Sequence, residues 1–191
     1  MKDVKNILLV GVGGQGTILA SKILSEGLTA AGYDVKMSEI HGMSQRGGDV
    51  STQIRYGEKV YSPIVGEGAA DVIVAFEKME ALRWIKYLKP NGRIIINDYE
   101  IATVPIQTGA EAYPDKIIET LSGAADTAVI NAGDIALKLG SFKIMNIVLL
   151  GALVKAMGLT SLDWKSLIKN NVKEDFLEIN LKAFAAGFEY I

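Results

Sequence analysis

Apolar residues in this chain fall into short continuous runs that alternate with stretches of helical spacing. A continuous run of four to eight apolar residues is typical of a strand covered on both faces of a parallel sheet, whereas apolar positions three and four residues apart predict a helix. The strand-like runs lie at residues 6–10, 35–40, 71–75, 93–97 and 127–130. Their alternation with helical stretches predicts an α/β fold with a mostly parallel sheet.

Helical spacing is clearest at residues 18–31, which follow the first strand and end at Gly32. Further helices are predicted at residues 77–88, 113–121 and 134–139. The first helix and the strands on either side of it should form a β-α-β unit with a right-handed crossover.

Two other segments predict additional strands. Residues 49–56 and 60–61 predict a β-hairpin that turns at residues 57–59. Residues 104–107 predict a further short strand.

The last third of the chain is predicted to be helical. Residues 143–157 are apolar around most of a helix circumference, which indicates a core helix, with an interface in a permanent complex as the alternative. Thr160 or Ser161 is expected to cap a helix that runs through Asn170, with Asp163 near its positive end. Residues 172–188 predict the final helix. The patterns together predict one domain over the whole chain, with a three-layer Rossmann-like architecture, a mostly parallel sheet, a β-hairpin insertion and a helical C-terminal part.

Composition narrows the classes of function. The chain has 191 residues, 49% of them hydrophobic and 22% charged, with a net charge of −2 and no dominant basic patch, which argues against nucleic-acid binding. It has no cysteine, so disulfides, thiolate nucleophiles and cysteine-ligated clusters are excluded on this chain. The apolar stretch at residues 144–158 is interrupted by Asn146 and Lys155 and is too short to span a bilayer. No signal-peptide pattern opens the sequence, so a cytoplasmic protein without membrane partners is expected.

A glycine-rich loop follows the first predicted strand. Residues 11–16 read Gly-Val-Gly-Gly-Gln-Gly and match G-x-G-x-x-G between a strand and a helix. Glycines allow the backbone to approach a phosphate, and the helix N-terminus offers free N–H groups. Glu39 lies near the place where dinucleotide-binding folds carry an acidic residue for the ribose. The spacing alone leaves open whether this loop binds a phosphate or only makes a tight turn.

A second polar loop follows the second predicted strand and should face the same end of the sheet. Residues 41–48 read His-Gly-Met-Ser-Gln-Arg-Gly-Gly. Arg46 can clamp a phosphate or carboxylate, with pairing to Asp49 or to a partner's carboxylate as the alternative. Gln45 can orient polar ligand groups. His41 is a weak candidate for acid–base catalysis, and a strand-end residue that hydrogen-bonds its own loop is the preferred interpretation.

These two loops in this order resemble the gamma-type module of the 2-oxoacid:ferredoxin oxidoreductases, and most closely the small (beta) subunit of the indolepyruvate members. The segments 60–63, 71–77, 87–92 and 180–184 also fall in the family's order, so the resemblance covers nearly the whole chain. The whole superfamily shares the glycine loop, whereas the amino-acid sequence of residues 41–48 is more specific to the indolepyruvate members.

The resemblance implies a subunit of an enzyme that oxidatively decarboxylates a 2-oxoacid, such as indolepyruvate, to the acyl-CoA and passes electrons to ferredoxin. It implies a hetero-oligomer in which a larger partner subunit carries thiamine diphosphate, Mg²⁺ and iron–sulfur clusters. This chain, which lacks cysteine and a thiamine motif, would cover the active site. By analogy, the residues that would contact coenzyme A are Gly11, Gly13, Gly14, Gln15, Gly16, Gln45, Arg46 and Gly47.

Three alternatives stay open at the level of sequence. The first is a stand-alone NAD- or FAD-binding Rossmann oxidoreductase that uses Glu39 on the ribose. The second is a scaffold that only stabilises the large subunit. The third keeps the family but takes pyruvate, a branched-chain 2-oxoacid or 2-oxoglutarate as the substrate.

Overall fold

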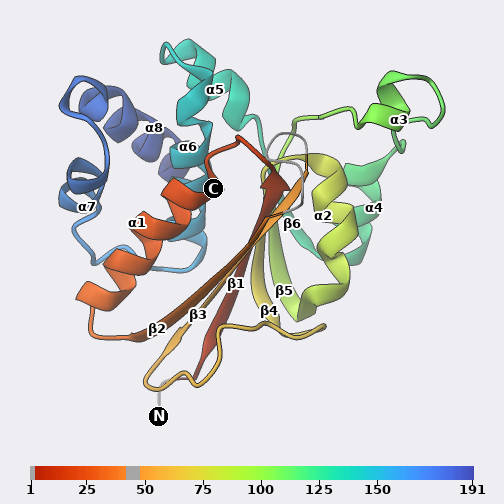
Figure 1. Cartoon of the computed structure of the whole chain (residues 1–191). Helices are drawn as coiled ribbons and strands as arrows, with labels where there is room; N and C mark the ends of the chain where they lie inside the picture. Colours follow the sequence, from red (N-terminus) through yellow and green to blue (C-terminus); the bar gives the residue numbers. More distant parts are fainter. Residues whose placement is uncertain (1–2, 42–47) are drawn as a thin grey trace.

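The computed structural model describes residues 3–41, the side chain of His41 excepted, and residues 48–191 (Figure 1). Its strands are β1 (Lys5–Val12), β2 (Asp34–His41), β3 (Asp49–Gly57), β4 (Ala70–Ala75), β5 (Leu88–Asn97) and β6 (Asp126–Ile130). Its helices are α1 (Thr17–Ala30), α2 (Lys78–Trp84), α3 (Val104–Gln107), α4 (Ile117–Ala124), α5 (Ala132–Lys138), α6 (Met145–Ala156), α7 (Trp164–Asn171) and α8 (Leu177–Tyr190).

The six strands form one mixed sheet in the order β2-β3-β1-β4-β5-β6. Strands β1, β4, β5 and β6 pair in parallel, whereas β3 is antiparallel to both of its neighbours, β1 and β2. The parallel strands contain continuous apolar runs because helices cover both faces of the sheet. In β1, for example, the consecutive residues Ile7, Leu8 and Leu9 are all buried.

Helices cover both faces of the sheet, which confirms the three-layer α/β prediction. Alternate residues of β1 enter two separate cores: Ile7 and Leu9 pack with the side of α1, α6 and α8, and Leu8 and Val10 pack with the side of α2 and α4. The two helical layers lie on opposite sides of the sheet in Figure 1. No helix in the two described ranges is long and apolar enough to cross a membrane.

Helix α6 is the centre of the larger core. Ten of its 12 residues are buried within this chain, so the core interpretation of the apolar segment is confirmed. Two glycines let α6 and α8 approach closely. A Cβ atom at Gly151 would lie 2.1 Å from the carbonyl oxygen of Phe184, and one at Gly187 would lie 1.8 Å from that of Val148.

The predicted hairpin is wrong in its position. The structure pairs β3 with β2, the strand that precedes it in the chain, so β3 lies inside the sheet between β2 and β1. Residues 60–61 are not a strand, although Val60 is buried and its N–H donates to Asp34 Oδ2 at 3.0 Å. Strand β3 ends at Gly57, and residues 60–61, which follow the predicted turn, do not pair with it as a strand.

Three other local predictions also need correction. Residues 104–107 form a short helix, because Pro105 fits the first turn of a helix and none of the four residues is buried. The cap of α7 is Asp163, whose Oδ1 accepts a hydrogen bond from the N–H of Ser166 at 3.1 Å, and not Thr160 or Ser161. The helix predicted at residues 77–88 ends at Trp84, and a 3₁₀ turn leads into β5 at Leu88.

Candidate functional site

The two loops singled out in the sequence begin at the same edge of the sheet. The glycine loop follows β1, and the N–H of Gly13 donates to the carbonyl of Gly48 at 2.9 Å, at the point where the second loop enters β3. The carboxyl ends of parallel strands are where open α/β sheets bind ligands. Of the second loop, Gln45, Arg46 and Gly47 and the side chain of His41 lie outside the described residues.

The glycines of the first loop serve different purposes. Gly16 precedes α1 with φ of 81°, and a Cβ there would lie 2.6 Å from Nδ2 of Asn146. Gly11 is similarly confined, since its Cβ would lie 2.9 Å from Cβ of Phe76. Gly14 has φ of 97° but open space around it, with no atom within 4 Å of an added Cβ. Close packing therefore requires Gly11 and Gly16, and backbone conformation requires Gly14.

The side chain of Gln15 holds this loop together. Its Oε1 accepts from the N–H of Val12 at 2.8 Å, and its Nε2 donates to the carbonyl of Phe76 at 3.0 Å. The Gln15 amide is thus already hydrogen-bonded to the backbone at the ends of β1 and β4. The groups of this loop that remain for a ligand are therefore those of its backbone. Among the described residues, the N–H groups of Gly14 and Gly16 have no acceptor. Together with the positive end of α1, they can receive an anionic oxygen.

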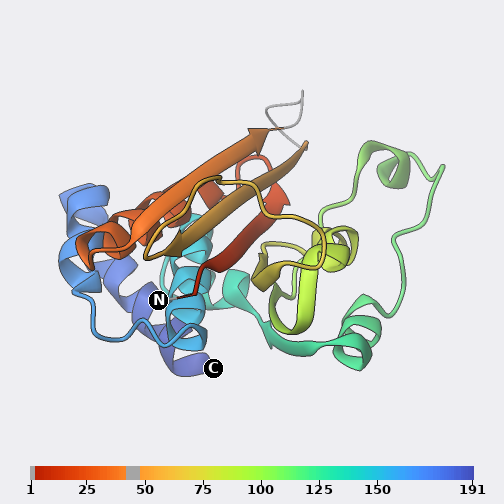
Figure 2. The same ribbon diagram turned by 90° about the horizontal axis from the view of Figure 1, so that it is seen from below.

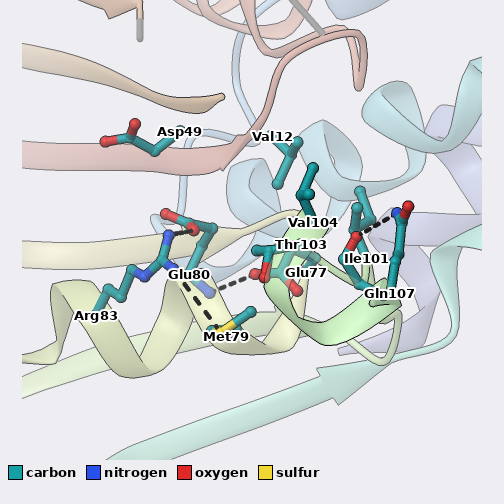
Figure 3. Close-up of a pocket in the computed structure, with 11 residues that line it drawn as sticks. Val12, Asp49, Glu77, Met79, Glu80, Arg83, Ile101, Thr103, Val104 and Gln107 are labelled. Carbon is teal, nitrogen blue, oxygen red and sulfur yellow. Dashed lines mark hydrogen bonds and ion pairs between the residues drawn. The ribbon is translucent and has the colours of Figure 1, made fainter. Parts of the chain in front are cut away.

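A cleft of about 450 Å³ opens beside the glycine loop (Figure 3). One wall comes from the end of β1, the start of β3 and the first turns of α2, and the other from the segment around α3. The lining residues are Val12, Asp49, Glu77, Met79, Glu80, Arg83, Ile101, Ala102, Thr103, Val104 and Gln107. The cleft is therefore lined by three carboxylates and one guanidinium together with apolar side chains.

Glu77 organises the base of the cleft. It is buried and caps α2, because its Oε1 accepts from the N–H of Glu80 at 2.5 Å. Its Oε2 accepts from the hydroxyl of Tyr113 at 3.0 Å, and that hydroxyl in turn accepts from the N–H of Met79 at 3.1 Å. Burial, together with the charge of Glu77 and the hydrogen bond to it, raises the pKa of Tyr113, so the phenol stays protonated and remains a donor.

Glu80 is the most perturbed carboxyl group of the cleft. Its residue is 1% exposed, Oε1 accepts from Nη1 of Arg83 at 2.7 Å, and Oε2 is buried with no partner among the described residues. Burial is the main cause that raises the pKa of Glu80 to about 7, with Arg83 opposing and Glu77 and Asp49 adding to the rise. The group therefore changes its charge near neutral pH.

The outer wall of the cleft is an arm formed by residues 98–116, which projects from the body of the molecule in both views (Figure 1 and Figure 2). Lys78 at the start of α2 forms ion pairs with the first residues of the arm. Its Nζ lies 3.2 Å from Oδ1 of Asp98 and 2.5 Å from Oε1 of Glu100. Although burial opposes it, these two carboxylates raise the pKa of Lys78. Near the other end of the arm, the hydroxyl of Tyr113 donates a hydrogen bond to Glu77, the residue that caps α2. Helix α2 thus holds both ends of the arm.

The arrangement does not suit Glu39 as a ribose ligand. Strand β3 lies between β1 and β2, which places Glu39 across from Thr52 and Thr52 across from Leu9. Oε1 of Glu39 accepts from the hydroxyl of Ser21 on α1 at 3.1 Å. In the dinucleotide-binding arrangement the second strand lies directly beside the first, so the inserted β3 removes the geometric basis of that alternative.

Sequence reasoning missed the α2 side of the cleft. Glu77 lies two residues after the end of β4, a position at which an acidic residue faces the ligand-binding edge of a sheet. That signal is present in the sequence, although the spacing of residues 77–88 by itself predicts only a helix. Nothing in the sequence indicated that Tyr113 returns to this place.

Comparison with known proteins places the chain in a family. The family model described as pyruvate ferredoxin/flavodoxin oxidoreductase matches residues 6–190. Indolepyruvate oxidoreductase subunit IorB of Thermococcus kodakarensis is 40% identical over 189 residues, covering 95% of this chain and 93% of the relative. The subunit of the same name from Methanothermobacter thermautotrophicus is 40% identical, with 96% and 95% covered.

Solved structures share the fold. The gamma subunit of a keto/oxoacid ferredoxin oxidoreductase from Geobacter sulfurreducens is 26% identical, with a TM-score of 0.73 and 97% of both chains covered. A 2-oxoglutarate:ferredoxin oxidoreductase from Magnetococcus marinus, solved with 2-oxoglutarate, coenzyme A and succinyl-CoA bound, has a TM-score of 0.77 at 24% identity. This chain corresponds to 31% of that one. The chain therefore belongs to the pyruvate ferredoxin/flavodoxin oxidoreductase family.

Proposed function

We propose that this chain is a subunit of a 2-oxoacid:ferredoxin oxidoreductase that oxidatively decarboxylates an aryl pyruvate such as indolepyruvate to the acyl-CoA. The choice of substrate rests on sequence identity, which differs between relatives named for different 2-oxoacids. Relatives named as indolepyruvate oxidoreductase subunits are 37–40% identical over more than nine-tenths of the chain. Relatives named for pyruvate, ketoisovalerate or 2-oxoglutarate are 27–30% identical.

The chain's own residues support a division of labour with a larger partner subunit. Iron–sulfur clusters need thiolate ligands, and the sequence has no cysteine. Thiamine diphosphate supplies the decarboxylation chemistry when it is bound, and we assign it, with its Mg²⁺ and the clusters, to the partner. Ferredoxin accepts the electrons of the complex. The structural relative in which this module is 31% of a longer chain supports such an assembly.

The role of this chain is to cover the active site and help hold coenzyme A. The open surroundings of Gly14, the N-terminus of α1 and the N–H groups of Gly14 and Gly16, which find no acceptor within residues 3–41 and 48–191, suit a phosphate oxygen. Gly48 lies at this place through its hydrogen bond to Gly13, and we propose that Gln45, Arg46 and Gly47, which precede it in the sequence, also contact the coenzyme. The alternative is a scaffold without ligand contacts.

Arg46→Ala in the reconstituted complex tests the contact. A ligand role predicts normal assembly with a raised KM for coenzyme A or for the 2-oxoacid, because a bidentate cation is lost. Unchanged kinetics would support the scaffold. Arg93→Ala is the matched control, since Arg93 pairs with Asp126 on the exposed edge of the sheet, far along the strand from the site.

A further inference from the structure

The arm at residues 98–116 is longer and more exposed than a simple connection between β5 and α4 needs to be. Its one helix, α3, has four residues and buries none of them, and it lies far out on the arm (Figure 1 and Figure 2). Of the apolar side chains in this fully described segment, Tyr113 alone packs against either core. A long connection with so little structure of its own is uncommon within a compact domain, and such connections usually serve a function.

Hydrogen bonds inside the tip of the arm give it a defined shape without contacts to the body. The N–H of Thr108 donates to the carbonyl of Val104 at 3.0 Å. The chain then turns back, because the N–H groups of Ala110 and Glu111 donate to the carbonyl of Pro105 at 2.9 and 3.2 Å. A projection that is already formed loses less conformational entropy on binding than a flexible loop does.

The tip presents apolar surface to water. Val104 is 71% exposed, and Pro105 next to it is exposed as well. Ala110 and Ala112, where the chain turns back, add further exposed apolar surface. Since neither core of this chain reaches the tip, only another molecule can remove these side chains from water.

The arm also carries an excess of negative charge. Residues 98–116 contain four acidic residues and one lysine, a net charge of −3, whereas the whole chain has −2. Lys78 pairs with the two acidic residues at the start of the arm. Glu111 and Asp115, toward its other end, are exposed and form no ion pair with a described residue. A basic surface is therefore complementary to this part of the arm.

The charge distribution favours a different protein over a second copy of this chain. Outside the arm the chain is nearly neutral, with a net charge of +1, so another copy offers little attraction for the arm. An arm of one copy on a different surface of the next would also be a head-to-tail contact, which forms a ring or an open filament and not a symmetric dimer.

We propose that the arm is the anchor by which this chain docks on the larger subunit. Val104 and Pro105 enter an apolar pocket of that subunit, and Glu111 and Asp115 face lysine or arginine residues at the rim of the pocket. The proposal rests on the proposed function in one respect, the identity of the larger subunit. The arm is also the outer wall of the cleft, and α2 holds both of its ends, so docking fixes the cleft relative to the partner.

Isothermal titration of the full chain into the purified larger subunit measures the Kd without any turnover. Val104→Asn should raise the Kd about tenfold, because a side chain buried at the interface becomes polar. The control is Ile64→Asn in the connection between β3 and β4, where Ile64 is 54% exposed and its carbonyl accepts from Arg55. The control should leave the Kd unchanged. Both exchanges are at exposed positions, so thermal unfolding of each lone variant should match that of the parent chain.

A second pair of variants tests the charge. Glu111→Gln/Asp115→Asn should raise the Kd about fivefold at about 0.05 M salt and less than about twofold at about 0.5 M, because salt screens exposed charges. The control Glu174→Gln/Asp175→Asn neutralises two exposed acidic residues directly before α8, in the helical layer on the other side of the sheet. Arm variants that bind like their controls, or controls that weaken binding as much as the arm variants, would overturn the proposal.

Sedimentation and activity separate the remaining outcomes. If the lone chain associates with itself and Val104→Asn abolishes this association, the arm binds a second copy and the proposal is wrong. If the arm variants weaken binding as expected but the parent complex oxidises no 2-oxoacid, the docking stands and the proposed function fails. If the complex oxidises its 2-oxoacid and the arm variants bind as tightly as the parent chain, the function stands and the docking is refuted.

Discussion

Replacing Glu80 by glutamine should remove a pH-dependent loss of stability from the chain. A glutamate side chain has a pKa of 4.5 when unperturbed, and burial raises the pKa of Glu80 to about 7. Between pH 4.5 and about 7, the carboxyl group of Glu80 has lost its proton in the unfolded chain but keeps it in the folded chain. Folding stability therefore falls as the pH rises from about 4.5 to about 7, since the unfolded state binds fewer protons there.

The difference between the two pKa values sets the size of the effect. At 1.36 kcal/mol per unit it corresponds to about 3 kcal/mol, and this net value already contains the opposing attraction of Arg83. Glu80→Gln keeps the shape and loses the charge. At pH 8 the variant should be more stable than the parent chain by up to about 3 kcal/mol, and at pH 5 by less than about 1 kcal/mol.

Urea unfolding of the purified full chain, followed by far-UV circular dichroism at pH 5, 6, 7 and 8, measures this difference. Subtracting the two free energies of unfolding cancels every other group that titrates in the range. Glu119→Gln, the same exchange at an exposed position of α4, is the matched control. A constant difference for Glu80→Gln would refute the assignment of a near-neutral carboxyl group to the cleft.

Three further outcomes follow from the packing. Gly187→Ala should destabilise the chain by about 3 kcal/mol or more, because the new Cβ would meet the carbonyl oxygen of Val148; thermal unfolding measures the loss. Tyr113→Phe should cost about 1–3 kcal/mol and loosen the arm, since buried Glu77 loses its donor; a limited-protease digest should then cut residues 98–116 faster. Gly14→Ala should cost about 1–3 kcal/mol from its positive φ, without a steric clash, and an unchanged unfolding temperature would contradict that reading.

The fold class was predictable because burial on both faces leaves a plain mark in the sequence. Strands β1 and β4, residues 93–97 of β5 and helix α6 are nearly continuous apolar runs, and each lies where its pattern predicts it, whereas the polar first half of β5 is not predicted as strand. Strand β3 shows where pattern fails. It contains Ser51, Thr52 and Gln53, which are buried although they are polar, because its neighbours on both sides pair with its backbone. Strand order depends on such long-range pairing, which local periodicity does not record.

The site was predictable only in part for a similar reason. The glycine loop is contiguous in sequence, so its spacing revealed both the turn and the helix that follows it. The cleft is assembled from β1, β3, α2 and the arm, whose residues come together only after folding. Gln15 shows a further limit: its amide looked like a ligand group, and the structure commits it to the backbone of Val12 and Phe76.

The most direct test of the proposed function is reconstitution of 2-oxoacid oxidation with defined subunits. The purified chain alone should oxidise no 2-oxoacid. Addition of a larger thiamine- and cluster-carrying subunit should give coenzyme A-dependent reduction of ferredoxin, faster with indolepyruvate than with pyruvate or 2-oxoglutarate. Hydride transfer to tightly bound NAD by the lone chain, or a reconstituted complex that prefers 2-oxoglutarate, would contradict it.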